Sequence, residues 1–222
     1  MNLNLTDILL LALRLLLIIP AIILHEISHG YVAYLLGDTT AKDAGRLTLN
    51  PIAHVDLWGT ILMPAMLFFL SGGAFAFGYA KPVPINPNRM YKTNFQMGML
   101  LTGVAGPVTN ILLAVVSAIV FRVVSLVSLP TIVGDIFYYF SFINLILAFL
   151  NLIPIPPLDG SRVVQYFLKG RALQQYYAIE RYGFAIILAV VFILPRFTNF
   201  DLLGGYFNIT AYPLLKLLTG VA

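Results

Sequence analysis

The sequence predicts an all-α integral membrane protein, a polytopic bundle of helices, and three observations lead to that prediction. Hydrophobic side chains make up 60% of the 222 residues and charged side chains only 10%, whereas soluble domains have about 45–50% and about 25%. Several apolar runs approach the roughly 20 residues that a helix needs to cross a bilayer. The 13 basic residues are scattered rather than gathered on one face. These features exclude a water-soluble globule and a nucleic-acid-binding protein.

The apolar runs define the expected elements in chain order. We expect membrane spans at residues 3–24, 99–129, 132–153 and 176–194. A weaker run at 202–218 contains Pro213 and Lys216, and it either spans the membrane or lies at its surface. The connections between the runs are short, so we expect one transmembrane domain over residues 1–222, with its motifs between about 20 and 165.

The segment 57–80 is predicted to dip into the membrane and return. Its purely apolar part, 57–70, would be about 21 Å long as a helix, which is short for a span. Ser71-Gly72-Gly73 then interrupts it, and Pro82 and Pro84 favour an extended backbone. The pattern predicts a re-entrant helix and a short β-hairpin close to the functional residues, and a full crossing is the alternative.

The first span ends in His25-Glu26-Ile27-Ser28-His29. Residues four apart lie on one face of a helix, so both imidazoles can bind one metal ion while Glu26 reaches a water bound to it. Two histidines, a carboxylate and an open fourth position form the tetrahedral arrangement of hydrolytic zinc sites. The alternative is a pair of buried structural histidines. We favour zinc because ionisable groups inside an apolar helix are costly and usually functional.

A third zinc ligand is expected at Asp159. This residue ends the stretch Asn-Leu-Ile-Pro-Ile-Pro-Pro-Leu-Asp-Gly, which directly follows the predicted span 132–153. Three prolines make the stretch rigid and non-helical, and such backbone is tolerated at membrane depth only where it is buried or lines a wet cavity. The alternative is that Asp159 caps a helix beginning near Ser161.

At these residues the sequence resembles the site-2 proteases, which are membrane-embedded zinc metalloproteases of the M50 type. The resemblance rests on His-Glu-Ile-Ser-His, on the stretch Gly-Pro-Val-Thr-Asn that ends at Asn110, and on the stretch that ends at Asp159-Gly160. The sequence also resembles a compact bacterial branch without PDZ or CBS domains. The resemblance implies that His25, His29 and Asp159 hold one zinc ion per chain and that Glu26 is the general base. It also implies transmembrane proteins or peptides as substrates.

Three further residues are candidates for binding substrate or supporting the site. Asn110 could hydrogen-bond substrate, orient a ligand or polarise the scissile carbonyl, but it could equally join two helices. His54 could support the site or be purely structural. Asn151 begins the stretch that leads to Asp159.

The distribution of charge predicts how the chain lies in the bilayer. If His25, His29 and Asp159 share one ion, the first span and the span 132–153 must run in the same direction. Nine of the 13 basic residues then lie on the side of the motifs: Lys42, Arg46, Lys81, Arg89, Lys92, Arg162, Lys169, Arg171 and Arg181. Because basic residues mark the cytoplasmic side, we expect a site that opens toward the cytoplasm from a bacterial cell membrane.

Two other functions fit part of this pattern. A membrane zinc transporter would also place histidine and aspartate in its spans, but it would need several ligand sets along a path. A catalytically silent, protease-like binding protein would have lost a motif residue, and none is lost here. Peptide-bond hydrolysis in or near transmembrane segments is therefore the predicted function.

Overall fold

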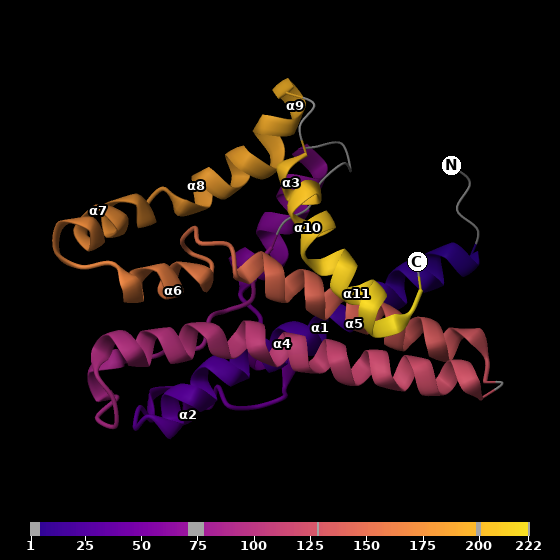
Figure 1. Ribbon diagram of the computed structural model, residues 1–222, viewed down its shortest axis with the longest axis horizontal. Helices are drawn as coiled ribbons and strands as arrows, with labels where there is room; N and C mark the ends of the chain where they lie inside the picture. The colour runs from indigo at the N-terminus through magenta and orange to yellow at the C-terminus, as the bar shows by residue number, and fades with distance from the viewer. Residues whose placement is uncertain (1–4, 71–77, 128, 199–200, 222) are drawn as a thin grey trace.

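A computed structural model describes residues 5–70, 78–127, 129–198 and 201–221 of the chain. The described part is all-helical (Figure 1). Three of its helices are long and apolar enough to cross a membrane, namely α1 (Leu5–Leu35) over residues Ala12–Leu35, α4 (Phe95–Leu126) and α5 (Thr131–Asn151). These three helices overlap the first three predicted spans, but α1 and its candidate span continue to Leu35 instead of ending at residue 24, so His25 and His29 lie inside this span and not at its end.

The three long helices pack together as the core of the bundle. The helices α1 and α5 run in the same direction and α4 runs in the opposite one (Figure 1), which is the arrangement that a shared metal ion requires. On α4 the buried positions include Gly103, Gly106 and Ala114, small residues that let neighbouring helices approach closely. On its outer face Leu112 and Val116 are about 60% exposed, as expected of a surface that meets lipid rather than water.

The connection from α1 to α4 leaves the bundle and returns to the same place. It contains α2 (Thr40–Asp43), the 3-10 turns η1 (Pro51–His54) and η3 (Pro87–Arg89), the π-helical turn η2 (Leu57–Leu62) and α3 (Met63–Leu70). Where the chain returns, the Tyr79 N–H donates to the Gly59 carbonyl at 3.0 Å. The two ends of the segment 57–80 therefore lie next to each other, as a re-entrant path requires. That this segment dips into a membrane stays a prediction.

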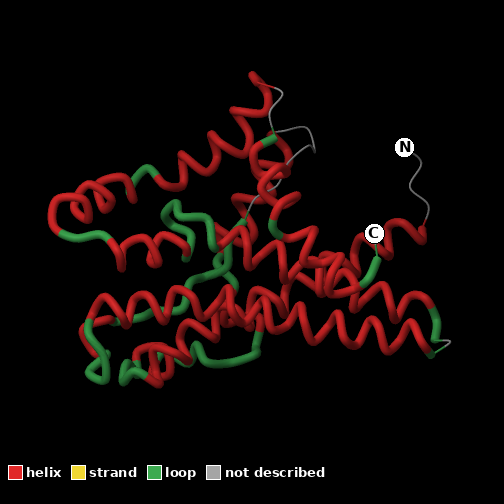
Figure 2. The backbone as a smooth tube through the Cα atoms, in the orientation of Figure 1, coloured by secondary structure: helices red, strands yellow, loops and turns green. Residues whose placement is uncertain are grey.

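The predicted β-hairpin is not seen in the described residues, which contain no strand (Figure 2). Residues 71–77, where its first half was predicted, lie outside the described part of the chain. From Gly78 to Asn86 the chain is non-helical, as Pro82 and Pro84 require.

The C-terminal third differs from the sequence prediction. In place of one span at 176–194, α7 (Gly170–Glu180) ends at Glu180, and a second helical run follows as α8 (Gly183–Leu188), η4 (Ala189–Ile193) and α9 (Leu194–Thr198). The break has a packing reason, because a Cβ on Gly183 would lie 1.8 Å from the Pro156 carbonyl oxygen. The run 202–218 is also divided, at Thr210, into α10 (Leu202–Ile209) and α11 (Ala211–Thr219).

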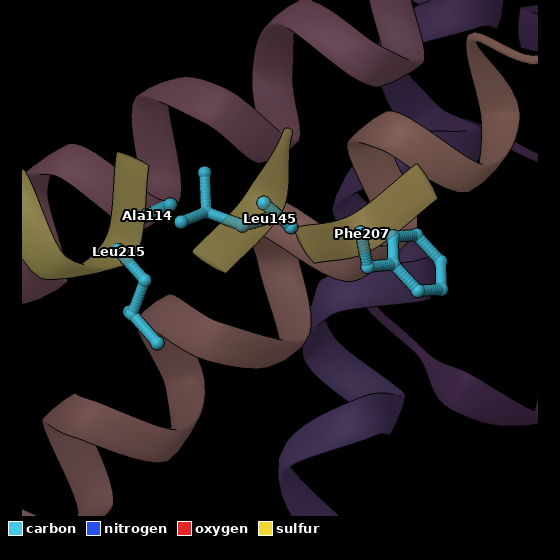
Figure 3. Packing of buried hydrophobic residues seen from close by; sticks show 5 residues of the cluster. Ala114, Leu145, Phe207 and Leu215 are labelled. Atoms are coloured by element: carbon cyan, nitrogen blue, oxygen red, sulfur yellow. The ribbon is translucent and has the colours of Figure 1, made fainter. Parts of the chain in front are cut away.

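A hydrophobic cluster attaches this last helix pair to the bundle. Phe207 of α10 and Leu215 of α11 pack with Ala114 of α4 and Leu145 of α5 (Figure 3). Leu145 is completely buried. The cluster therefore holds α4 and α5 in a fixed relation, and these are two of the helices that support the site described next.

Candidate metal centre

Three potential ligands from two distant parts of the chain meet at one point. His25 and His29 lie one turn apart on α1, and Asp159 lies in the loop between α5 and α6 (Gly160–Phe167). The Asp159 Oδ2 atom is 3.1 Å from His25 Nε2 and 3.2 Å from His29 Nε2. All three residues are buried, and their ligand atoms lie within 4.8 Å of one another. They form a group that could hold a metal ion.

The protonation of His29 is determined by a backbone carbonyl. Its Nδ1 lies 2.6 Å from the Thr102 carbonyl oxygen. Because a carbonyl can only accept, Nδ1 carries the proton, and in a neutral ring Nε2 then presents a lone pair. That lone pair is directed at the Asp159 carboxylate.

Asn110 orients His25. The His25 Nδ1 atom lies 2.8 Å from Asn110 Oδ1, and Asn110 Nδ2 donates to Asn144 Oδ1 at 3.1 Å. Asn110 therefore offers His25 an acceptor, so the proton again sits on Nδ1 and the Nε2 lone pair is free. This is one of the roles left open by the sequence, because Asn110 contacts a potential ligand as well as joining α4 to α5.

Asp159 does not cap the helix that follows it. It occupies the N-cap position of α6, but its side chain makes no capping hydrogen bond. The contacts with the two rings do not have hydrogen-bond geometry, so Oδ2 is a buried oxygen without a donor. Burial opposes ionisation of this carboxyl, whereas protonated rings at His25 and His29 lower its pKa, and a cation bound between the three groups would do the same.

The loop before Asp159 is shaped by a glycine. A Cβ on Gly160 would lie 2.2 Å from the Leu152 carbonyl oxygen, so only glycine lets the chain fold back there. Pro156 is fully buried within the loop. Pro154 and Pro157 are exposed, and Pro157 lines a cavity. The loop is thus partly buried and partly cavity-lining, which are the two surroundings that the three prolines predicted.

These observations fit a zinc ion. Two neutral imidazoles direct lone pairs at a carboxylate oxygen, an arrangement that a shared cation stabilises. A tetrahedral ion with bonds of about 2.0 Å separates its ligands by about 3.3 Å, close to the distances found here. A space is also kept open, because a Cβ on Gly106 would lie 2.5 Å from His25 Nε2 and 2.6 Å from His29 Nε2.

Glu26 is oriented by the extended segment that returns toward α4. Its Oε2 accepts a hydrogen bond from the Val83 N–H at 3.1 Å, and the carboxylate lines the same cavity as the two histidines. Glu26 is next to His25 in sequence, so it lies about 100° around α1 from that ligand. This placement suits a group that exchanges protons beside the ion rather than binding it.

A cavity of about 390 Å³ opens onto the three ligands. The extended segment lines one side of it through Tyr79, Ala80, Pro82, Val83 and Ile85, and Asn151, Pro157, Leu158, Arg162, Phe184 and Ile187 complete the lining. Sequence reasoning missed Arg162. Its alkyl chain packs on Gly103, and its Nη1 is buried without a hydrogen-bond partner in the described part of the chain.

The other two candidates lie in different surroundings. Asn151 lines the cavity, but its amide donates to the Leu147 carbonyl of its own helix at 2.9 Å. His54 does not line this cavity. Its Nε2 lies 2.8 Å from the Thr48 carbonyl oxygen, and its own carbonyl accepts from the Lys81 N–H at 2.9 Å. His54 thus supports the extended segment, and its role in the reaction stays a prediction.

The known proteins that this chain resembles are peptidases, in agreement with the metal-binding geometry of the site. The family model described as peptidase family M50 matches residues 13–194. The protein YwhC of Bacillus subtilis (strain 168), whose name describes a zinc metalloprotease, is 38% identical over 184 residues, which is 80% of this chain and 78% of that protein. Rip2 of Mycolicibacterium smegmatis, also named a zinc metalloprotease, is 26% identical over 83% of this chain and 69% of its own length. Rip2 of Mycobacterium tuberculosis is 27% identical over 87% of this chain and 69% of its own length. No solved structure matches the chain significantly.

Proposed function

The chain belongs to peptidase family M50 and is an intramembrane zinc metalloprotease, and from this premise we propose roles for its residues. His25, His29 and Asp159 hold one zinc ion per chain, and Glu26 is the general base. The observation that carries the proposal is the convergence of two imidazole lone pairs and one buried carboxylate on a single point.

The chemistry divides between the ion and Glu26. Zinc lowers the pKa of a bound water to about 7 and polarises a carbonyl. Glu26 takes a proton at its carboxylate during attack on the scissile carbonyl and returns it to the leaving amine. The Val83 N–H holds one oxygen of Glu26, which fixes the direction of the other.

The extended segment provides a place for an unwound substrate. The backbone groups of residues 79, 81 and 83 form hydrogen bonds with the rest of the protein. For example, the Lys81 N–H donates to the His54 carbonyl at 2.9 Å, and the Lys81 carbonyl accepts from Arg46 Nη2 at 2.7 Å. Alternate residues of an extended chain present their backbone groups to opposite edges. Ala80 between them makes no hydrogen bond in the described part of the chain. Its N–H and carbonyl are therefore available to a peptide added as a strand.

The substrates are transmembrane proteins or peptides, and the site opens toward the cytoplasm. The basic residues support this orientation because nine of 13 lie on the side of the metal centre. Arg162 also favours a peptide as the substrate. Its buried Nη1 needs a hydrogen-bond acceptor, and a carbonyl group of a bound peptide would be one.

The substitution Glu26→Gln tests the proposal. It removes the proton acceptor and leaves the three ligands in place, so we expect hydrolysis to fall by at least about a hundredfold while one zinc per chain remains. The measurement compares membrane-protein fragments, by mass spectrometry, from cells that carry either form, together with the zinc content of the purified proteins. Full cleavage by Glu26→Gln would contradict its role. Zinc flux into vesicles without any peptide cleavage would instead favour a transporter.

A further inference from the structure

A line of buried amides leads from the metal centre into the helix bundle. Asn110 on α4 and Asn144 on α5 both have no exposed surface. Their side chains are joined by the bond from Asn110 Nδ2 to Asn144 Oδ1. Asn144 makes no hydrogen bond to His25, His29 or Asp159 and does not line the cavity. Neither the sequence motifs nor the proposed chemistry uses it.

The Phe140 carbonyl, at the end of this line away from His25, determines the direction of every hydrogen bond in it. Asn144 Nδ2 donates to the Phe140 carbonyl at 2.8 Å, and that carbonyl can only accept. The oxygen of Asn144 must then face Asn110, which donates its Nδ2 to it. The oxygen of Asn110 is thereby turned toward His25 Nδ1.

This chain of bonds determines which nitrogen of His25 is protonated. An amide oxygen beside Nδ1 stabilises the Nδ1–H form, whose Nε2 can bind a metal. If the Asn110 amide turned over, its NH₂ would face Nδ1 and favour the Nε2–H form, which has no lone pair for the ion. In a buried site the wrong orientation would leave polar groups unpaired, which is costly.

We propose that Asn144 is a positioning residue that acts through Asn110 to hold His25 in the tautomer able to bind zinc. The inference rests on the proposed function, in which His25 is a zinc ligand. It adds an outer partner on α5, so that all three long helices contribute to the orientation of one imidazole. Outer partners of this kind commonly change metal affinity 10–100-fold.

The substitution Asn144→Leu tests the inference, with Ser141→Ala as its matched control. Leucine has a similar shape but cannot accept from Asn110. Ser141 lies one turn earlier on α5, is equally buried, and bonds to the Ala114 carbonyl of α4 at 3.0 Å outside the line of amides. We expect Asn144→Leu to weaken zinc binding about 10–100-fold in chelator competition, and Ser141→Ala to bind zinc as the wild type does.

The nitrogen-15 spectrum of the histidines distinguishes tautomer control from general loosening. In the full chain stripped of zinc, Asn144→Leu should move His25 toward the Nε2–H form and leave His29 unchanged, because the Thr102 carbonyl holds His29 independently. Asn144→Asp keeps an oxygen for Asn110 and should stay nearer to the wild type in both measurements, which provides a second variant if leucine impairs folding.

Two results would overturn the inference. One is an Asn144→Leu protein whose zinc affinity and His25 spectrum equal those of Ser141→Ala. The other is an equal change in His25 and His29. A failure of the underlying function is recognised separately: His25→Ala would then bind zinc as tightly as the wild type, whatever Asn144→Leu does.

Discussion

The two histidines of the metal centre are oriented by partners of different chemical types. His29 is held by the Thr102 backbone carbonyl, which no side-chain substitution at that position removes. His25 is held by the Asn110 side chain, whose orientation depends on its neighbours. The site therefore contains one proposed ligand held by the backbone and one held by a network of side chains, and we expect the second to be more sensitive to mutation.

Gly106 is the residue on α4 that leaves room for both rings. The substitution Gly106→Ala places a methyl group where the Cβ would lie 2.4 Å from His25 Cε1 and 2.6 Å from His29 Nε2. The rings must move, so we predict that zinc affinity falls by at least about tenfold, an effect typical of misoriented ligands. The measurement is chelator competition on the purified full chain.

Gly134→Ala is the matched control for this prediction. Gly134 is also a buried glycine of a long helix, but a Cβ there would lie 3.7 Å from its nearest neighbour, an ordinary contact. We expect it to bind zinc as the wild type does. Equal zinc affinities for Gly106→Ala and Gly134→Ala would show that the close approach of α4 does not shape the site.

The site residues that could be predicted from the sequence are those marked by their local spacing or by rigid backbone next to them. The four-residue separation of His25 and His29 is a property of one helix, and the prolines before Asp159 indicate a rigid loop. The structure brings these residues together as expected. The contact of Arg14 with Tyr139, 125 positions away, and the burial of Arg162 Nη1 could not be predicted, because they depend on how helices pack.

At the element scale, the extended segment from Tyr79 to Val83 links the re-entrant region to the metal centre. One of its edges is bonded to Gly59, His54, Arg46 and Glu26, and Ala80 faces the other edge. The same segment therefore orients Glu26, the proposed general base, and lines the cavity. Substrate binding along it would place a peptide beside both.

The substitution Ala80→Pro tests whether this edge binds substrate. Proline removes the Ala80 N–H, which bonds to no described residue, so the contacts of the segment with the protein can remain. Loss of one hydrogen bond of about 1.5 kcal/mol predicts a drop of roughly tenfold in the cleavage rate of a transmembrane substrate. Zinc content should not change.

Ala80→Gly keeps the N–H and serves as the matched control. Its cleavage rate should stay near that of the wild type. If the proline and glycine variants cleaved at the same rate, the Ala80 N–H would have no part in substrate binding, and the proposed strand edge would be wrong.

The sequence predicted helices correctly where the length of an apolar run is enough to identify them. The first three spans are confirmed as long helices, whereas the run 176–194 is divided because Gly183 packs on the Pro156 carbonyl. That contact joins residues 27 positions apart, so the local sequence around Gly183 does not reveal it. The β-hairpin stays a prediction, since half of it lies outside the described residues.

In the whole molecule, α1 and α5 run in the same direction (Figure 1), so the end of α5 that leads to Asp159 lies on the same side as the C-terminal half of α1, which carries His25 and His29. The end of α4 and the beginning of α5 lie at the other end of these helices (Figure 1). Lys169, between α6 and α7, is one of the nine basic residues on the metal side. The charge distribution therefore predicts opposite membrane faces for this residue and for the end of α4.

Single cysteines can test this orientation directly, because the natural chain has none. We predict that an impermeant thiol reagent labels Leu126→Cys in intact cells, whereas it labels Lys169→Cys only after the membrane is opened. Leu126 is 87% exposed, and the side chain of Lys169 is exposed as well. Labelling of Lys169→Cys in intact cells would reverse the proposed orientation, and equal labelling of both would contradict the span assignment.

Binding of one zinc ion by two imidazoles and one distant carboxylate underlies every role proposed for these residues. Zinc content and zinc K-edge absorption of the purified chain test it most directly. We expect one zinc per chain with two imidazole nitrogens and a carboxylate oxygen at about 2.0–2.2 Å. The zinc should be lost in Asp159→Ala and kept in Asp135→Ala, whose aspartate is exposed. An Asp159→Ala protein with the zinc content and spectrum of the wild type would contradict it.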